Sequence, residues 1–340
     1  MLLNYRVSRL KNTPTEVREQ PQKITLLICV KNAYTETVAL LKQIDILDLV
    51  DYDVDVLIVD DYSDPPLGDH NQTLVCRYPI KIIKAGRDIA GKKSAIHSGI
   101  LDCKDGIILL TDVDCIPSTQ WVTRMANATV QDRVTLGYSP FIRHKTSINK
   151  WARYENVITA VQYIGWALLG RPYMGVGRNM ALTKSAVSAL TLDDLHPHVP
   201  GGDDDMIVQY IGQASVCLDA ESYVFTEAPS SWQSYFAQKR RHYAISTHYP
   251  LSTKVILSLY SLSQIGVFVL SVFALLLGLW KLVFIIWMIR MGLMLVSSIN
   301  LFKRFEQLDL WYWLPMLDVV LSLYYIVFGF TFLLPKSKQW

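Results

Sequence analysis

The chain has 340 residues and a formal net charge of +3, and its mean hydropathy of +0.22 is high for a wholly soluble enzyme. Six basic and three acidic residues after Lys254 account for the whole net charge, so the first 254 residues are close to neutral, which excludes an electrostatic nucleic-acid binder. The five cysteines form no CxxC pair, which argues against a zinc ribbon or a disulfide framework and favours a reducing compartment.

The first part of the chain alternates strand-like and helix-like patterns. Residues 1–21 contain no apolar core run, so we expect neither a signal peptide nor a membrane anchor there, and we place the following domain in the cytosol. Near-continuous Val, Ile and Leu runs joined by helical patterns predict an α/β domain with a mainly parallel sheet, covered on both faces. The predicted strands lie at 23–30, 54–61, 80–86 and 106–114, and the predicted helices at 35–50 and 92–101.

Acidic residues follow two of these strands. Asp60 and Asp61 come after one strand, and Asp112 and Asp114 come after another. Ligands of such sheets bind beyond the carboxyl ends of the strands, and neighbouring carboxylates repel one another unless a cation or hydrogen-bond donors lie among them. We therefore expect Asp112 and Asp114 to bind Mg²⁺ or Mn²⁺ against a diphosphate. Capping of the next helix is the alternative, although Ser118 is already a suitable N-cap.

A third acidic group is "GGDDDMIVQY", residues 201–210. The three aspartates could simply favour the N-terminus of the apolar helix that follows. The two glycines before them permit a close ligand approach, so one carboxylate could instead be a general base. His196 and His198 raise a metallohydrolase alternative, but the prolines around them favour solvated histidines.

The last third of the chain is basic and then apolar. "QKRRHY", residues 238–243, suits an anionic membrane surface, with a solvated helix face as the alternative. Apolar runs follow at about 255–280, 282–299 and 310–334, and roughly 20 such residues cross a bilayer. Arg290 and Asp318 interrupt the second and third runs, and pairing of the two, or contact of Arg290 with a lipid-linked phosphate, would relieve the cost of an intramembrane charge.

The basic residues of the sequence do not give these segments a single orientation in the membrane. With the preceding domain inside the cell, three full spans place Lys303 and Arg304 inside, as the positive-inside rule requires. The same arrangement leaves Lys336 and Lys338 outside. One segment could therefore be re-entrant or interfacial.

With these motifs assembled, residues 22–245 resemble a membrane-associated family 2 glycosyltransferase with the GT-A fold, related to cellulose-synthase-like and hyaluronan-synthase-like enzymes. The resemblance implies an N-terminal extension at 1–21, an α/β GT-A nucleotide-diphospho-sugar transferase domain with a Rossmann-like mixed sheet at 22–231, an interfacial helix region at 232–254 and a membrane domain of about three hydrophobic segments at 255–340. The segments that carry it are, in chain order, "LLICVKNAYTETV", "LIVDDYSDP", "GKKSAIHSGI", "LLTDVDCIPSTQWV", "YMGVGRNMALTKSA", "GGDDDMI" and "QKRRH".

The resemblance also implies roles for residues. The implied donor-binding residues are Lys31, Asn32, Asp60, Asp61, Lys92, Asp112 and Asp114, with Asp112 and Asp114 as metal ligands. The implied acceptor side comprises Gly175, Gly177, Arg178 and Asn179. The implied catalytic residues are Asp203, Asp204, Gln238 and Arg241, and the motif places the base at Asp203 with Asp204 as its rival. The chain departs from the family pattern at His97 (usually Asn), Gly202 (usually Glu) and His242 (usually Trp).

The resemblance implies an inverting enzyme that needs Mg²⁺ or Mn²⁺. It is expected to move a sugar from a nucleotide-diphosphate donor, UDP-linked by resemblance, to a hydroxyl of a lipid-linked or cell-envelope polysaccharide acceptor at the cytoplasmic face of the plasma membrane. A processive polysaccharide synthase is the alternative within that class, and the missing tryptophan argues against it. A catalytically inert, membrane-anchored nucleotide-sugar-binding subunit and a metal-dependent phosphotransferase are the alternatives from other classes.

Overall fold

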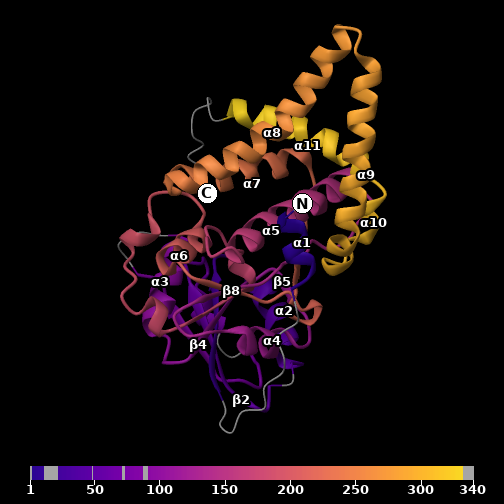
Figure 1. The fold of residues 1–340 in the computed structure, drawn as a ribbon. Coiled ribbons are helices and arrows are strands. Elements are labelled where there is room, and N and C mark those ends of the chain that lie inside the picture. The colour runs from indigo at the N-terminus through magenta and orange to yellow at the C-terminus, as the bar shows by residue number, and fades with distance from the viewer. Residues whose placement is uncertain (1, 11–21, 48, 71–72, 87–90, 332–340) are drawn as a thin grey trace. The chain divides into compact units, whose positions relative to one another are not determined.

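The computed structural model describes residues 2–10, 22–47, 49–70, 73–86 and 91–331 (Figure 1). Contacts within the chain divide it into two units, which we describe separately. The sheet unit comprises Leu10–Ile142 and Ala160–Ala228, and the helical unit comprises Met1–Arg9, Arg143–Thr159 and Pro229–Trp340. The long helix α5, Ser147–Ala167, contributes residues to both units.

A seven-stranded mixed sheet in the order β3-β2-β1-β4-β7-β6-β8 forms the centre of the sheet unit. The first four strands in this order run parallel, β7 is antiparallel to both β4 and β6, and β6 is parallel to β8. This confirms the predicted α/β class and mixed sheet. The strands are β1 Gln22–Val30, β2 Tyr52–Asp60, β3 Ile80–Lys84, β4 Ile107–Asp112, β6 Val134–Leu136, β7 Met180–Thr183 and β8 Ala214–Val216, and a separate pair is formed by β5 Cys115–Pro117 and β9 Val224–Thr226.

Helices join these strands because the parallel order requires crossovers that bury an apolar face. Helix α3 approaches the sheet closely through Gly99, where an added Cβ would overlap the side chain of Leu27 on β1. This close packing sets the position of the first turn of α3, which carries Lys92. The helices of the sheet unit are α2 Tyr34–Asp45, α3 Lys92–Asp102, α4 Trp121–Ala128 and α6 Asp203–Ile211.

Two local expectations are wrong. The helix predicted over 35–50 ends at Asp45, and among the described residues of 46–50 no helix continues. Ser118 is not the N-cap of α4, because the helix begins at Trp121 and Gln120 precedes it without a side-chain capping bond. Ser118 instead accepts the Trp121 backbone N–H through its carbonyl oxygen and donates its backbone N–H to Tyr223, so it belongs to the turn before the helix.

The helical unit contains the apolar C-terminal helices. Helices α8 Leu251–Leu276 and α9 Trp280–Arg304 are long and apolar enough to cross a membrane, and a short turn joins them into a hairpin (Figure 1). The run predicted as a third span is divided into α10 Leu308–Trp311 and α11 Leu314–Thr331, and its apolar stretch among the described residues covers only Leu314–Val327. The remaining helices of this unit are α1 Leu2–Ser8 and α7 Trp232–Ile245, together with the first part of α5.

Arg290 and Asp318, the two charges inside the apolar runs, are paired. The Arg290 guanidinium donates to both carboxylate oxygens of Asp318, at 2.7 and 2.9 Å, and to the side-chain oxygen of Gln264 at 2.7 Å. These residues lie on α9, α11 and α8, so one guanidinium connects three apolar helices. Of the two expectations for Arg290, the structure confirms the ion pair.

We expect loss of the Asp318 carboxylate alone to destabilise the helical unit by about 3 kcal/mol or more, because it leaves the Arg290 charge without its partner among apolar helices. The thermal midpoint of detergent-purified Asp318→Leu should therefore fall well below that of wild type. The double variant Arg290→Met/Asp318→Leu should recover much of the loss, because both charges are then gone. A double variant no more stable than Asp318→Leu would contradict this account.

Candidate active site

The carboxyl ends of the parallel strands meet at one edge of the sheet, and the predicted donor-binding residues lie there. The register pairs Val30 with Asp60 and Cys29 with Asp112, so β1, β2 and β4 end at nearly the same level. Lys31 follows β1 directly, and Asp61 follows β2. Parallel pairing alone therefore brings together residues from three distant parts of the sequence.

The loop after β2 is held by Asp60. One oxygen of this buried carboxylate accepts the backbone N–H of Ser63, and the other accepts that of Leu67, both at 2.9 Å. Asn32 is tied to the same loop, since its backbone N–H donates to the Ser63 hydroxyl and its side-chain oxygen accepts the Asp64 N–H. Asp60 and Asn32 thus shape the loop, with their side-chain oxygens turned to its backbone.

Asp61 is the carboxylate that faces the neighbouring segments. It is buried, with Lys31 Nζ 3.3 Å from one oxygen and the Gly91 backbone N–H donating to the other at 2.9 Å. These contacts join the ends of β1 and β2 to the start of α3. Asp61 therefore connects neighbouring segments, whereas Asp60 holds its own loop.

Lys92 connects the second and third acidic motifs. Its ammonium lies 2.6 Å from Asp112 Oδ1 at the end of β4 and 3.5 Å from Asp203 Oδ2 at the start of α6. Burial acts against the charge of Lys92, but the two carboxylates outweigh it and raise the pKa of this lysine. Burial likewise acts to raise the pKa of Asp112, but Lys92 outweighs it and holds that pKa below its usual value. Both groups therefore remain charged at neutral pH.

Asp204 has a different environment from Asp203. Its two oxygens accept the backbone N–H groups of Gly177, at 2.9 Å, and Asp205, at 3.1 Å. Burial, with the neighbouring Asp203 carboxylate, raises the pKa of Asp204 to about 6. Gly177 lies next to both aspartates, since an added Cβ would be in van der Waals contact with Asp203 Oδ2 at 3.5 Å and Asp204 Oδ2 at 3.7 Å.

The remaining residues expected on the acceptor side divide into two kinds. Asn179 is fully buried: its side-chain oxygen accepts the Trp121 indole N–H, and its amide donates to the Tyr138 and Ser222 carbonyl oxygens. Gly175 is also buried, and an added Cβ would press on core side chains. Arg178 is half-buried, donates to the Ser139 hydroxyl at 2.6 Å and contributes to lowering the pKa of Asp112. Arg178 therefore faces the charged site, whereas Asn179 and Gly175 support it.

Asp112 and Asp114 suit a hard divalent cation in their chemistry. Asp114 is exposed at the turn after β4, and Asp112 keeps one oxygen outside its bond to Lys92. Such cations often take one or two carboxylates and complete their shell with water and phosphate oxygens. The described part of the chain contains no cluster of three or more His, Cys, Asp or Glu residues placed to hold a metal. A cation held by these two carboxylates would complete its shell with water or phosphate oxygens.

Two neighbours of the site carry no role in the sequence analysis. Lys93 is buried, donates to the His196 carbonyl oxygen at 3.1 Å, and burial lowers its pKa. Cys29 lies beside Asp112 in the sheet, and burial raises the pKa of its thiol. The signal for Lys93 was present in the doubled lysine at the start of α3. The signal for Cys29 was its position next to the end of β1.

Gln238 and Arg241 lie on α7 in the helical unit, where Gln238 is half-buried and Arg241 is exposed. Their catalytic role remains a prediction.

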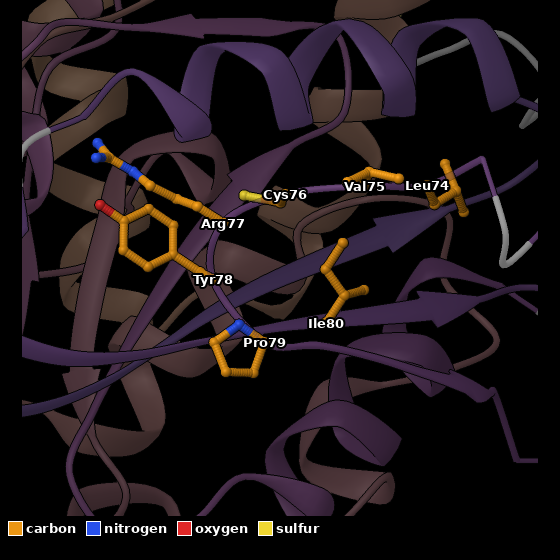
Figure 2. A pocket seen from close by; sticks show the side chains of 7 residues that line it. All are labelled: Leu74, Val75, Cys76, Arg77, Tyr78, Pro79 and Ile80. Carbon is orange, nitrogen blue, oxygen red and sulfur yellow. The ribbon is translucent and has the colours of Figure 1, made fainter.

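The sheet unit also has a surface pocket, which lies away from the acidic residues at the carboxyl ends of its strands. Figure 2 shows its lining, which is the continuous segment Leu74–Ile80. Strand β3 begins at Ile80, so this pocket lies at the amino end of that strand. The acidic residues lie at the opposite, carboxyl ends, where a ligand of such a sheet is expected.

Comparisons with known proteins agree with this arrangement. The model of the family described as "Glycosyl transferase family 2" matches residues 25–180. The mannosyltransferase PcManGT from Pyrobaculum calidifontis, solved in complex with GDP-Man and Mn²⁺, matches 95% of this chain and 94% of its own, with a TM-score of 0.53 and 15% identity. At this identity the likeness shows the fold, and it extends over most of the C-terminal helices. No curated protein sequence matches the chain.

Two further structures are more distant. TarS 1-349 of S. aureus, in complex with UDP-GlcNAc, matches 62% of this chain and 59% of its own, with a TM-score of 0.42 and 11% identity. GalNAc-T7, with UDP, GalNAc and Mn²⁺, matches 62% of this chain and 45% of its own, with a TM-score of 0.44 and 14% identity. Both superpose too loosely to support a conclusion.

The mixed sheet with its acidic carboxyl edge and the family match together define a glycosyltransferase with the GT-A fold. Within that class, residues 25–180, a little under half of the chain, are similar to glycosyl transferase family 2. The enzyme class and the fold expected from the sequence are confirmed.

The raised pKa of Asp204 predicts a pH-dependent stability. A carboxyl whose pKa rises from 3.8 to about 6 on folding stabilises the fold below pH 4, and this contribution is lost as the pH rises through 6. Relative to Asp204→Asn, which does not titrate, the wild-type free energy of unfolding should therefore fall by about 2 to 3 kcal/mol between pH 4 and pH 8. Unfolding midpoints of both proteins across this range would measure the change.

Asp194→Asn serves as a control, because Asp194 should change the free energy of unfolding with pH in the opposite direction. Its exposed carboxylate accepts hydrogen bonds from Thr191, which lower the pKa of Asp194, so its contribution is lost as the pH falls. A pH-independent difference between wild type and Asp204→Asn would contradict the environment described for Asp204.

Proposed function

We propose that this glycosyltransferase is an inverting enzyme that moves a sugar from a UDP-linked donor to a hydroxyl of a lipid-linked or polysaccharide acceptor. Its transferase domain would lie at the cytoplasmic face of the plasma membrane, held there by the apolar C-terminal helices. The observation that carries the proposal is the position of Lys92, within 3.5 Å of both Asp112 and Asp203. One ammonium thus lies between the carboxylate that we propose to bind the donor and the one that we propose to act as base.

At the donor end, Lys31 and Asp61 would contact the nucleotide base, and Asp112 and Asp114 the ribose and a divalent cation. A bound Mg²⁺ or Mn²⁺ supplies positive charge for the leaving diphosphate. Lys92 lies beside Asp112 and keeps that carboxylate ionised. Much of the catalysis then rests on positioning and on charge already in place before the reaction.

At the acceptor end, the hydrogen bonds favour Asp203 over Asp204 as the base. Both Asp204 oxygens accept backbone N–H groups, whereas Asp203 faces the flexible ammonium of Lys92. Asp203 would take the proton of the acceptor hydroxyl as its oxygen attacks the anomeric carbon, opposite the departing diphosphate, which inverts the configuration. Arg241, with Gln238, would hold the diphosphate or the acceptor through planar donors suited to phosphate oxygens.

Transfer of single sugars is favoured over processive synthesis. His242 stands where the related polymer synthases carry a tryptophan, so the stacking surface for an acceptor sugar is absent at that position. Product length, measured with the purified enzyme and its acceptor, distinguishes the two.

The donor is tested by calorimetric titration of the detergent-purified protein with UDP, GDP and dTDP, each with and without Mn²⁺. We expect UDP to bind at least about tenfold more tightly with the cation, and Asp112→Asn/Asp114→Asn to lose this gain, because the carboxylates supply the cation's protein ligands. If only GDP binds, the proposal of a sugar transferase stands, and the donor is GDP-linked rather than UDP-linked. If the folded protein binds none of the three nucleotides, the donor proposal fails and the inert-subunit alternative gains support.

The base is tested separately. Asp203→Asn should leave nucleotide affinity within about twofold and lower the rate of sugar transfer, or of donor hydrolysis, by about 10² to 10⁴-fold, the usual contribution of a positioned base. Asp204→Asn is the matched control, since it changes the adjacent carboxyl in the same way. A larger loss in Asp204→Asn than in Asp203→Asn would assign the base to Asp204.

A further inference from the structure

We propose that Glu155 of α5 is a positioning residue of this enzyme. Its ion pair with Lys239 fixes the orientation of α7, and thereby that of Gln238 and Arg241. The inference rests on the proposed function, which gives these two α7 residues their role. Everything that carries it lies within the helical unit.

One face of α7 is anchored by residues spaced four apart. Tyr235 is buried, and the Lys239 ammonium lies 5.7 Å from the centre of its ring. Lys239 also forms the ion pair with Glu155, and the Tyr243 hydroxyl lies 3.0 Å from that of Tyr324 on α11. Positions four apart lie on one side of a helix, so these contacts define a single anchored face.

The Glu155 carboxylate is largely buried and is fixed by a second contact besides Lys239. Its side chain is only 9% exposed and that of Lys239 only 13%, so the pair is largely withdrawn from water. The second carboxylate oxygen accepts the Thr159 hydroxyl at 3.0 Å, one turn further along α5. A buried ion pair with a fixed carboxylate has a defined geometry, whereas an exposed lysine would swing freely.

Gln238 and Arg241 flank Lys239 in sequence but lie on another side of α7. Each residue turns the helix by about 100°, so Gln238 and Arg241 lie about 60° apart, with Gln238 on the flank of the anchored face and Arg241 nearly opposite it. A rotation or shift of α7 would carry both side chains with it. Displacements of about 1 Å in positioning groups can cost about a hundredfold in rate.

A neighbouring ion pair supplies the matched control. Arg153 lies two residues before Glu155 on α5 and is almost fully buried. It donates to Gln307 at 2.6 Å and to both Asp309 oxygens at 2.5 and 3.1 Å, so it holds the start of α10 rather than α7. Asp309→Asn therefore removes the half-buried carboxylate partner of another α5 residue and leaves the Lys239 contact in place.

The test compares Glu155→Gln with Asp309→Asn in the full-length, detergent-purified enzyme. We expect Glu155→Gln to lower kcat/KM for transfer by about tenfold to a hundredfold and to speed backbone hydrogen exchange across residues 232–245. Asp309→Asn should lower the thermal midpoint and leave kcat/KM within about twofold. Equal losses of kcat/KM in the two variants would overturn the proposal, because both would then act through general stability.

Two more variants keep the test decisive if Glu155→Gln does not fold. Lys239→Arg preserves the charge and should retain transfer, whereas Lys239→Met should reproduce the loss and the faster exchange. Equal activity of these two would overturn the proposal. Arg241→Ala distinguishes failure of the proposed function from failure of the positioning proposal. If this variant transfers sugar normally, the role proposed for α7 in the reaction is wrong. If Arg241→Ala loses transfer while Glu155→Gln and Lys239→Met keep it, the positioning proposal alone is wrong.

Discussion

Like charges gathered at one edge of a sheet repel one another, and the arrangement of the sheet unit follows from how that repulsion is offset. Parallel pairing places Asp61 and Asp112 at the same edge, and the start of α6 adds Asp203 nearby. The ammonium groups of Lys31 and Lys92 lie among these carboxylates. Lys92 reaches its position because α3 packs tightly on β1 through Gly99. A close contact seven residues along the chain from Lys92 thus controls the electrostatics of the site.

The helical unit deals with its charges in the same way. Arg290 pairs with Asp318, Arg153 with Asp309 and Glu155 with Lys239, and each pair joins different helices. Buried pairs contribute little net stability, because the attraction roughly repays the loss of hydration. Their geometry is nevertheless specific, since a helix that shifted would leave a buried charge without its partner. Each pair therefore constrains the helices that it joins.

The motif residues of the transferase domain perform two different tasks. Asp60, Asn32 and Asn179 use their side chains to hold loops and core, and their hydrogen bonds are made within the protein. Asp114 and Arg178 project toward solvent or toward the charged edge. A sequence motif contains both the residues that face the site and the residues that hold the surrounding loops, because the two kinds are neighbours in the chain. Only the hydrogen-bond partners separate them.

The sequence by itself determined the class of the molecule. Runs of Val, Ile and Leu with acidic residues at their carboxyl ends predicted the parallel strands and the edge where ligands bind, because strand direction and side-chain type are local properties. It also predicted the Arg290–Asp318 pair, since two isolated charges in apolar runs require partners. The tertiary structure decided what depends on long-range packing. It gave Asp60 and Asp61, and likewise Asp203 and Asp204, different hydrogen-bond partners, joined Lys92 to two motifs, and paired Glu155 with Lys239. Each of these choices depends on distances between residues far apart in the chain, which no local pattern encodes.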